Sequence, residues 1–439
     1  GKVQNVVHKT LLPTYDIFDE YRYFEPNRTF ECVSINGEQY ALTICEDLWN
    51  VDDNPLYYEN PMDYLIKQKP KAIINIAASP FSSKQAAKRT HILKKNAEKY
   101  GVPIVYVNHI GAQTELIFDG DSRFVNKTGE TVTSIPCFKE HSTIIDLNET
   151  ANNNNYPKPE SIALVHDALV LGIKDYFKKL GLKKATLGLS GGIDSAVVFA
   201  LAVKALGSQN VLPVLLPSQY THSLSVSEAV KMAQNLNCEH KIIPIQNIYS
   251  AFETELTEHF IGLKADVTEE NLQARSRGVL LMALSNKLGY IVLNTTNKSE
   301  MAVGYGTLYG DLCGGISVIG DVYKTAVYEM AEYINRTEEI IPRFIIDRPP
   351  SAELKEDQKD SDSLPSYDVL DPLLFLYIEE RKSPNELINM GFDETVVKRV
   401  VKLVNTSEWK RHQTAPILRV SEKAFGMGRR MPIVAKYFG

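Results

Sequence analysis

The stretch LGLSGGIDSA, residues 187–196, decides the fold of the second half of the chain. It joins an apolar run typical of a strand to an apolar run typical of a helix. Two adjacent glycines, Gly191 and Gly192, let the backbone approach an anion closely. The N–H groups that open the helix, with the helix dipole, would hold a phosphate. A bare glycine pair also fits a turn without a ligand, but SGGxDS between a strand and a helix favours a nucleotide site.

Strand and helix patterns alternate along the rest of the chain. After residue 160, helix patterns lie at 162–181, 193–207, 225–237 and 268–289, and strand patterns lie at 185–190, 211–218, 240–245 and 290–295. This order predicts an α/β fold with a doubly wound parallel sheet, whose ligands bind beyond the carboxyl ends of the strands. Nearer the start, strand patterns lie at 40–49, 71–79 and 102–110, and a basic helix pattern at 82–101 ends at Gly101. These patterns also predict α/β layers. The tail from Asp371 to residue 439 is expected to be helical and basic near its end.

The segment NETANNNNYPKPE, residues 148–160, separates the two halves. Four successive asparagines and two prolines make it rich in turn-forming residues and poor in apolar ones, which is typical of a linker. The sequence therefore predicts two domains, one at 1–150 and the other at 151–439.

Composition excludes several classes of protein. The 439 residues carry a formal net charge of -6, which argues against nucleic-acid binding through bulk charge. No apolar run approaches the roughly 20 residues of a membrane span, and the first residues have no apolar signal core. Five cysteines stand far apart without a CxxC pair or zinc spacing, which fits a reduced cytoplasmic compartment.

Three charged residues of the second half suit phosphoryl chemistry. Asp194 is acidic where a phosphate should sit, which makes sense if Asp194 binds Mg²⁺ that is itself bound to the phosphate. Glu300 follows a strand end and suits a second Mg²⁺ ligand, although a helix-capping carboxylate explains it equally well. Lys324 is a lone lysine, which on the residues alone is usually a surface residue. The absence of a GxxxxGK[ST] sequence excludes a Walker-type phosphate loop.

The SGGxDS motif resembles the pyrophosphate loop of the ATP pyrophosphatase superfamily, and further segments resemble NAD synthetase within it. These segments are ENLQARSRG (270–278), NTTNKSEMAVGYGTLYGDLCGG (294–315), IGDVYKT (319–325), RPPSAEL (348–354), DSLPSYDVLD (362–371) and the tail at 410–433. The resemblance implies an adenine-nucleotide alpha-hydrolase-like architecture that binds ATP, Mg²⁺ and deamido-NAD. The implied ATP-binding residues are Ser190, Gly191, Gly192, Asp194, Ser195, Arg275 and Thr296. The implied deamido-NAD contacts are Asp311 and Lys324, and the implied metal ligands are Asp194 and Glu300.

The first half resembles the nitrilase-type glutaminase half of glutamine-dependent NAD synthetases. The segments that carry the resemblance are HKTLLPTYDIFDEYRYFEP (8–26), LTICEDLWN (42–50), INIAASPF (74–81) and NHIGAQTELIFDGDS (108–122). The resemblance implies an α-β-β-α sandwich in which Cys45 is the nucleophile and Lys9 stabilises the oxyanion. It places four residues against glutamine or in support of its site: Tyr15, Glu46, Ser79 and Arg89. Without the resemblance, Cys45 reads as a buried core cysteine.

One element of the glutaminase pattern departs from the family. The general-base glutamate of the family lies well upstream of the lysine, and only eight residues precede Lys9 in this sequence. The first strands and helices of the sandwich are likewise absent, so the predicted sandwich is incomplete. We expect the numbering to begin partway through a longer protein, because a sandwich cut this early would expose its core.

The resemblance implies a carbon–nitrogen ligase that uses glutamine as the amide donor. Deamido-NAD is adenylated by Mg-ATP, and ammonia released from glutamine converts the adenylate to NAD, AMP and pyrophosphate. The implied partners are small molecules and a second copy of the chain, with no nucleic acid and no membrane. Two alternatives stay open on the residues alone: another ATP pyrophosphatase ligase, such as a GMP synthetase, and a catalytically silent nucleotide-binding protein.

Overall fold

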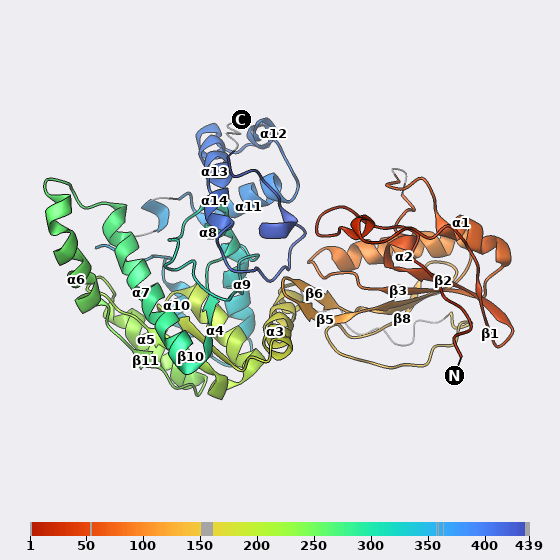
Figure 1. Cartoon of the computed structure of the whole chain (residues 1–439), viewed down its shortest axis with the longest axis horizontal. Helices are drawn as coiled ribbons and strands as arrows, with labels where there is room; N and C mark the ends of the chain where they lie inside the picture. Colours follow the sequence, from red (N-terminus) through yellow and green to blue (C-terminus); the bar gives the residue numbers. More distant parts are fainter. Residues whose placement is uncertain are drawn as a thin grey trace. The chain divides into compact units, whose positions relative to one another are not determined.

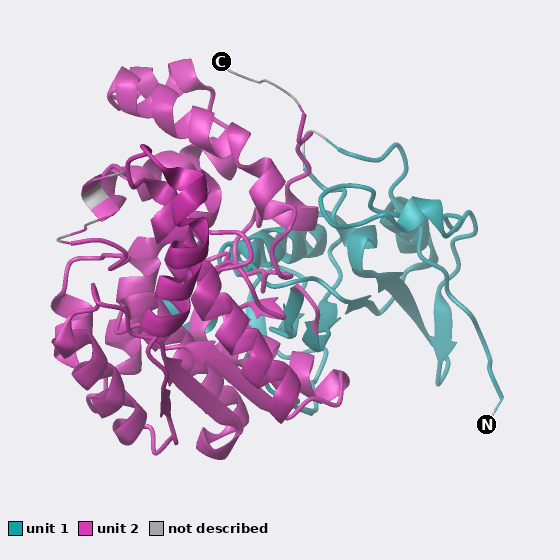
Figure 2. Ribbon diagram, turned by 60° about the vertical axis from the view of Figure 1, so that its left-hand side comes forward, with its two compact units in different colours: residues 1–112, 116–164 teal, residues 113–115, 165–439 magenta. Residues whose placement is uncertain are grey.

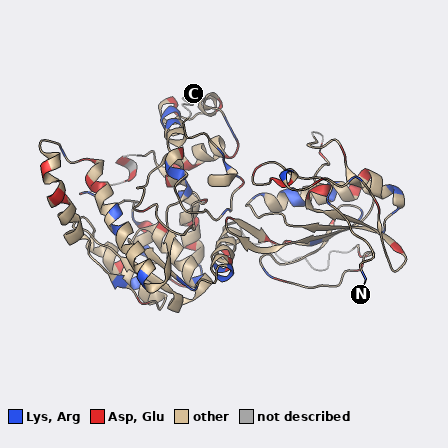
Figure 3. Ribbon diagram, viewed as in Figure 1, with Lys and Arg blue, Asp and Glu red and all other residues tan. Residues whose placement is uncertain are grey.

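The computed structural model of the chain describes residues 2–52, 55–150, 161–356, 358, 360–362 and 364–434. It divides into two compact units, shown in Figure 2. Unit 1 is Gly1–Ala112 with Leu116–Leu164, and unit 2 is Gln113–Glu115 with Val165–Gly439. Most of the predicted linker, residues 151–160, lies outside the described residues. None of the described helices is long and apolar enough to cross a membrane. Acidic and basic residues are interspersed along the helices of both units in the view of Figure 3.

Unit 1 contains a six-stranded mixed sheet with the strand order β1-β2-β3-β4-β7-β8. The strands are β1 (Val33–Ile35), β2 (Glu38–Ile44), β3 (Ala72–Ala77), β4 (Ile104–Asn108), β7 (Arg123–Val125) and β8 (Thr131–Ser134). β2, β3 and β4 run parallel, and the outer strands pair antiparallel. β5 (Ile110–Gln113) and β6 (Leu116–Asp119) form a separate hairpin. The helices are α1 (Pro61–Leu65) and α2 (Gln85–Tyr100), and α2 ends as predicted at Gly101, whose φ is 65°.

The strand predicted at 40–49 ends earlier, at Ile44. The carboxylate of Asp47 accepts a hydrogen bond from the Ile44 N–H at 2.9 Å, which folds the chain back into a 3-10 turn, η2 (Cys45–Leu48). Cys45 therefore has a positive φ of 45°. The same carboxylate accepts the N–H groups of Thr10 at 2.9 Å and Leu11 at 2.8 Å. Asp47 thus holds the segment that carries Lys9 against the end of β2.

Unit 2 is built on a fully parallel five-stranded sheet with the order β11-β10-β9-β12-β13, which confirms the predicted doubly wound sheet. The strands are β9 (Lys184–Gly188), β10 (Val211–Leu215), β11 (Lys241–Ile242), β12 (Tyr290–Asn294) and β13 (Ile316–Ser317). The chain runs outward from β9 to β11 and then returns to β12 on the other side of β9. The crevice beyond the ends of β9 and β12 is therefore the topological switch point, where such sheets bind ligands.

The helices of unit 2 flank this sheet and extend beyond it (Figure 1). They are α3 (Ser161–Lys179), α4 (Ile193–Leu206), α5 (Ser223–Asn235), α6 (Gln246–Leu256), α7 (Val267–Leu288), α8 (Lys298–Val303), α9 (Lys324–Ile334), α10 (Arg343–Asp347), α11 (Tyr367–Ile378), α12 (Pro384–Asn389), α13 (Glu394–Thr406) and α14 (Glu408–Arg411). The expected helical tail holds only as far as Arg411. Between residues 412 and 434 the structure has one short 3-10 turn, because this segment contains prolines and its Ile417 pairs instead with Ser317 of β13.

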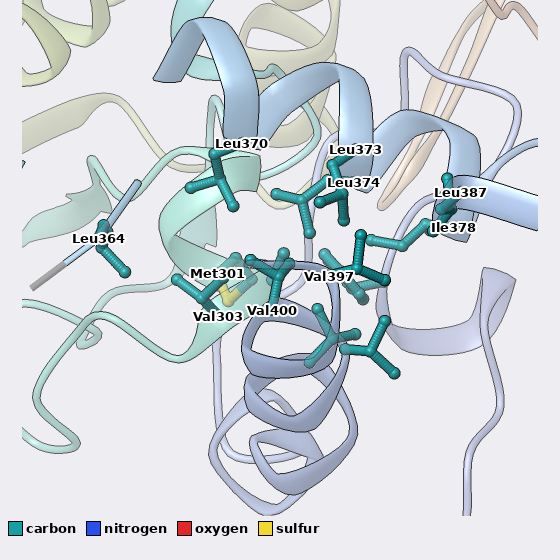
Figure 4. Packing of buried hydrophobic residues seen from close by; sticks show 14 of the residues in the cluster. Met301, Val303, Leu364, Leu370, Leu373, Leu374, Ile378, Leu387, Val397 and Val400 are labelled. Atoms are coloured by element: carbon teal, nitrogen blue, oxygen red, sulfur yellow. The ribbon is translucent and has the colours of Figure 1, made fainter. Parts of the chain in front are cut away.

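The packing of α8 against α11 and α13 forms an apolar cluster, which Figure 4 shows in close-up. Met301 and Val303 of α8 face Leu370 and Leu374 of α11, and Val400 of α13 closes the cluster. These side chains are between 0% and 4% exposed. The short helix α8 is therefore fixed by its apolar side, which positions its polar first turn.

Truncation of Leu374, which is fully buried in this cluster, should destabilise unit 2. We expect Leu374→Ala to lower the free energy of unfolding by about 2–5 kcal/mol, because a cavity replaces buried methyl groups. Hydrogen exchange of the α11 and α13 amides would measure the loss locally. Val369→Ala on the same helix is the control, since Val369 is 41% exposed and its truncation should cost under about 0.5 kcal/mol. Equal effects of the two substitutions would contradict this packing.

Two candidate active sites

The first site gathers Cys45, Lys9 and Glu20 at the end of β2. The Lys9 ammonium contacts both carboxylate oxygens of Glu20, at 2.8 and 2.6 Å. The positive charge of Lys9 lowers the pKa of the Cys45 thiol, because it favours the thiolate form. The structure thus brings the two predicted catalytic residues together. It adds Glu20, which sequence reasoning missed although it stands eleven residues after Lys9 in the same quoted segment.

The Cys45 thiol is protonated in this resting arrangement. Burial raises the pKa of Cys45 to about 11, and the charge of Lys9 and the backbone N–H of Ala78 only partly oppose that rise. A nucleophilic sulfur must lose its proton before it attacks. The arrangement therefore stabilises a thiolate once it forms but does not maintain one.

Glu46 lies beside the nucleophile and is held by two tyrosines. Its Oε1 accepts hydrogen bonds from the Tyr15 hydroxyl at 2.8 Å and from the Tyr57 hydroxyl at 3.1 Å. Glu46 is only 4% exposed, and burial raises its pKa while the two phenols oppose the shift. Tyr15 and Glu46 were predicted together, whereas Tyr57 was missed. Tyr57 is brought in by Asn50, whose amide donates to the Tyr57 carbonyl at 2.9 Å.

Ser79 and Arg89 also lie together, inside a buried ionic network. Both terminal nitrogens of Arg89 donate to the carboxylate of Asp119, at 2.8 and 2.7 Å, and one of them also reaches Asp121 at 3.3 Å. The Arg89 Nε donates to the Ser79 hydroxyl at 3.3 Å. Since Arg89 is 1% exposed, this geometry makes it a support for Ser79 rather than an open ligand contact. Direct contacts of either residue with glutamine stay predictions.

The second site is a pocket at the switch point of the parallel sheet. Its walls include nearly all the residues predicted for nucleotide and metal binding. These are Ser190, Gly191, Gly192, Asp194, Ser195, Thr296, Glu300, Asp311 and Lys324. Arg275 does not line this pocket; its Nε donates to the Leu308 carbonyl at 3.3 Å on the exposed side of α7. Arg277, two residues further on, lines the pocket instead.

Arg277 is a cation that sequence reasoning did not select. Its Nε donates to the Leu216 carbonyl at 3.0 Å, and burial lowers its pKa to about 10, against the influence of Asp311 and Glu353. At neutral pH it is still charged and faces the pocket. Asp311 itself accepts the Thr307 N–H at 2.6 Å, which closes the loop between α8 and β13.

The loop between β9 and α4 has the geometry of an anion cradle. Gly191 has a φ of 84°, and a Cβ at this position would lie 2.5 Å from the Ser225 carbonyl oxygen. Only glycine fits here without displacement. The N-cap of α4 is Gly192, which has no side chain to cap the helix, so the N–H groups of its first turn stay available to a ligand. Ser195 braces the loop, since its hydroxyl accepts the Ser190 N–H at 3.2 Å and donates to the Gly192 carbonyl at 2.9 Å.

Asp194, Glu300 and Lys324 converge at the floor of the pocket. The Lys324 ammonium forms an ion pair with Asp194 Oδ2 and lies 3.8 Å from Glu300 Oε1. Burial and the nearby charge of Asp194 raise the pKa of Glu300 well above its usual range. Burial disfavours the charged form of Lys324, but Asp194 and Glu300 outweigh it and raise its pKa. Lys324 is 2% exposed, so it is not the surface residue that a lone lysine usually is.

The oxygen donors of this cluster suit a divalent cation. Two carboxylates repel each other in a buried pocket, and a hard cation prefers carboxylate oxygens. No group of three or more His, Cys, Asp or Glu side chains with metal-binding geometry occurs among the described residues. The cluster therefore fits Mg²⁺ in the manner usual at phosphate sites, with one or two carboxylates and the remaining ligands from phosphate and water.

A loop between α10 and α11 covers one wall of the pocket. Arg348 forms close contacts with the Ser225 hydroxyl and with Glu353, and Glu353 Oε1 accepts a hydrogen bond from the Ser225 hydroxyl at 2.9 Å. The loop is also fastened to α7, where the Gln273 amide donates to the Leu354 carbonyl at 2.8 Å. Arg348, Glu353, Leu354 and Asp360 of this loop line the pocket.

Comparisons with known proteins agree with this architecture. The family model for NAD synthase matches residues 165–414. The glutamine-dependent NAD(+) synthetase of Synechocystis sp. (strain ATCC 27184 / PCC 6803 / Kazusa) is 44% identical over 445 residues, which cover 100% of this chain and 80% of the relative. The relative of the same name from Thermotoga maritima is 40% identical and covers 100% of this chain and 81% of itself.

Solved structures extend the similarity to three dimensions. The glutamine-dependent NAD+ synthetase from Acinetobacter baumannii in complex with adenosine diphosphate is 39% identical, with a TM-score of 0.75 over 99% of this chain and 79% of that chain. The NMN synthetase from Francisella tularensis is 29% identical, with a TM-score of 0.50 over 57% of this chain and 95% of that chain.

The sheet with its SGGxDS loop and the Cys45–Lys9 pair define a two-part carbon–nitrogen ligase. The chain is 44% identical to a relative along its whole length and 39% identical to a solved structure over nearly all of its length, and these similarities narrow the family within that class. The chain belongs to the glutamine-dependent NAD(+) synthetase family. The family and fold class expected from the sequence are confirmed, and the roles of individual residues stay predictions.

The rate at which Cys45 is alkylated should depend on pH as expected for a thiol with a pKa of about 11. Only the thiolate reacts, so the rate should rise about tenfold per unit between pH 7 and pH 10 without levelling near pH 8.5. Lys9→Met should slow the reaction further, because the lost positive charge raises the pKa again. Iodoacetamide labelling, quantified on the Cys45 peptide by mass spectrometry, measures this. A plateau below pH 8 would show that the resting thiol is already activated.

Substitution of Gly191 should weaken ATP binding by more than the strain of a positive φ alone would cause. Gly191→Ala meets the Ser225 carbonyl at 2.5 Å, so the loop must shift. We expect ATP binding to weaken by about tenfold or more, which corresponds to about 1.4 kcal/mol. Gly181→Ala is a matched control, since Gly181 also has a positive φ of 70° but nothing lies within 4 Å of its added Cβ. Calorimetric titration with ATP should show normal affinity in the control, and equal losses in both would reject the close contact as the cause.

Proposed function

We propose that this chain catalyses the glutamine-dependent, ATP-driven amidation of deamido-NAD to NAD. The observation that carries the proposal is the convergence of Asp194, Glu300 and Lys324 beneath an uncapped phosphate-type loop. Membership in the glutamine-dependent NAD(+) synthetase family supports the choice of substrates. The thiol of Cys45 beside Lys9 supports glutamine as the nitrogen source.

In the synthetase half, the nicotinate carboxylate of deamido-NAD attacks the α-phosphorus of ATP and expels pyrophosphate. Lys324 and Arg277 stabilise the negative charge that develops on the phosphate oxygens, and both line the same pocket. The first-turn N–H groups of α4 bind the departing pyrophosphate. Ammonia then attacks the acyl adenylate, the amide bond forms, and AMP leaves with the electron pair of the broken carbon–oxygen bond.

Asp194 and Glu300 are the groups that would hold Mg²⁺ in this half. When bound, Mg²⁺ supplies positive charge that neutralises the phosphate oxygens of ATP. Lys324 must then exchange its contact with Asp194 for contacts with phosphate. A small acidic protein chain of net charge -6 needs such local positive groups to bind two anionic substrates.

In the glutaminase half, the Cys45 sulfur attacks the side-chain amide of glutamine. Lys9 stabilises the tetrahedral oxyanion. The C–N bond breaks, and the departing nitrogen takes up the proton that the thiol has lost, which gives a glutamyl thioester and ammonia. Water then releases glutamate and restores the thiol. Glu46, held by Tyr15 and Tyr57, offers its second carboxylate oxygen to the glutamine ammonium group.

We also infer that the chain is a cytoplasmic homo-oligomer that pairs through its synthetase unit. Two apolar residues of α7, Val279 and Met282, are 63% and 40% exposed one helical turn apart, which supports a protein-covered face. All five cysteines of the sequence are free, which supports a reducing compartment.

An assay with two nitrogen sources tests the proposal. The wild type should release pyrophosphate and form NAD from deamido-NAD with either glutamine or ammonium. Cys45→Ala should lose glutamine-driven synthesis by at least about a thousandfold and keep ammonium-driven synthesis within about twofold, because only the thioester step needs the sulfur. Asp194→Ala should abolish both.

Control substrates and outcomes make this assay decisive. Xanthosine monophosphate tests the GMP synthetase alternative, and nicotinate mononucleotide tests the preference suggested by the name of the Francisella relative. No pyrophosphate release with deamido-NAD and either nitrogen source would reject the proposed function and favour a silent nucleotide-binding protein. Equal loss of both nitrogen sources in Cys45→Ala would reject the assignment of two separate chemistries.

A further inference from the structure

Asn297 lies between the two carboxylates of the synthetase pocket. It is the N-cap of α8 and is fully buried, with 0% of its surface exposed. Asp194 lies on α4 and Glu300 in the first turn of α8. Asn297 is therefore the point at which these two helices meet beneath the pocket.

Three hydrogen bonds connect Asn297 to both carboxylate residues. Its Nδ2 donates to Asp194 Oδ1 at 2.9 Å, and its Oδ1 accepts the Glu300 N–H at 3.0 Å. Its own backbone N–H donates to Glu300 Oε2 at 3.2 Å. The orientation of the amide is fixed by chemistry, because an ionised carboxylate can only accept and a backbone N–H can only donate.

The remaining carboxylate oxygens face a single positive group. Asp194 Oδ2 contacts the Lys324 ammonium, and Glu300 Oε1 lies 3.8 Å from the same nitrogen. In each carboxylate, one oxygen is hydrogen-bonded to Asn297 and the other faces the Lys324 ammonium. A neutral amide keeps its bond to Asp194 whether or not Lys324 moves away.

We propose that Asn297 is a positioning residue. It holds the carboxylates of Asp194 and Glu300 together so that each can give one oxygen to the same divalent cation. It fixes Oδ1 of Asp194 and Oε2 of Glu300, so that Oδ2 and Oε1 converge where the Lys324 ammonium now lies. The inference rests on the proposed function only in taking these two carboxylates as the metal ligands. Helix capping alone does not explain the residue, because serine caps about equally well and lacks the amide Nδ2 that donates to Asp194.

Two variants separate metal positioning from capping. Asn297→Ser and Asn297→Thr keep an oxygen for the Glu300 N–H and remove the Nδ2 bond to Asp194. In the full chain with α,β-methylene-ATP, calorimetric titration with Mn²⁺ should show an affinity weakened by about 10–100-fold, as for other residues that orient metal ligands. The same variants should need more Mg²⁺ for half-maximal ammonium-driven synthesis and should recover much of the rate at saturating Mg²⁺.

Ser383→Ala is the control, because Ser383 caps the remote helix α12 and contacts no residue of the pocket. It should lower the melting temperature without shifting the Mn²⁺ titration. Wild-type Mn²⁺ affinity in either Asn297 variant would overturn the proposal, even if its melting temperature falls. A wild type that binds Mn²⁺ with nucleotide yet makes no NAD would reject the proposed function but leave the positioning role standing.

Discussion

The structure of the synthetase unit depends on three consecutive polar residues that are entirely buried. Asn297, Lys298 and Ser299 are each 0% exposed at the start of α8. A buried polar group without a partner costs about 1–3 kcal/mol, and an unpaired buried charge costs more. Each of the three must therefore reach a partner, and each reaches a different part of the unit. The first turn of this short helix consequently determines where its neighbours lie.

The three side chains diverge to α4, to the C-terminal segment and to α11. Lys298 contacts Asp321 at 2.9 Å, Glu379 at 2.8 Å and the Ser421 hydroxyl at 2.7 Å. Ser299 shares its hydroxyl between the Asp371 carboxylate and the N–H of Lys324. Removing one partner would leave uncompensated charge in the interior, so these contacts specify geometry more than they add stability. This network of buried contacts therefore fixes the positions of the reactive groups of the pocket.

Local patterns predicted the elements and the ligand edge well, because strands, glycine stops and helix starts are encoded by nearby residues. SGGxDS lies at the switch point of the sheet as expected. Arg275 and Arg277 show where local reasoning ends: two residues apart on a helix they face nearly opposite directions, and only tertiary packing decides which faces the pocket. Glu20, and the contact of Asn297 with Asp194, were missed for a related reason, since a charged or polar residue near a turn looks solvated until its distant partner is known.

Ser225 links the covering loop to the phosphate loop. Arg348 and Glu353 hold its hydroxyl, while its carbonyl packs directly against Gly191. The loop between α10 and α11 and the phosphate loop between β9 and α4 therefore both contact one residue at the start of α5. A change in the position of Arg348 or Glu353 therefore acts on Gly191 through Ser225 directly. The order of the covering loop and the shape of the phosphate loop are coupled through a single residue.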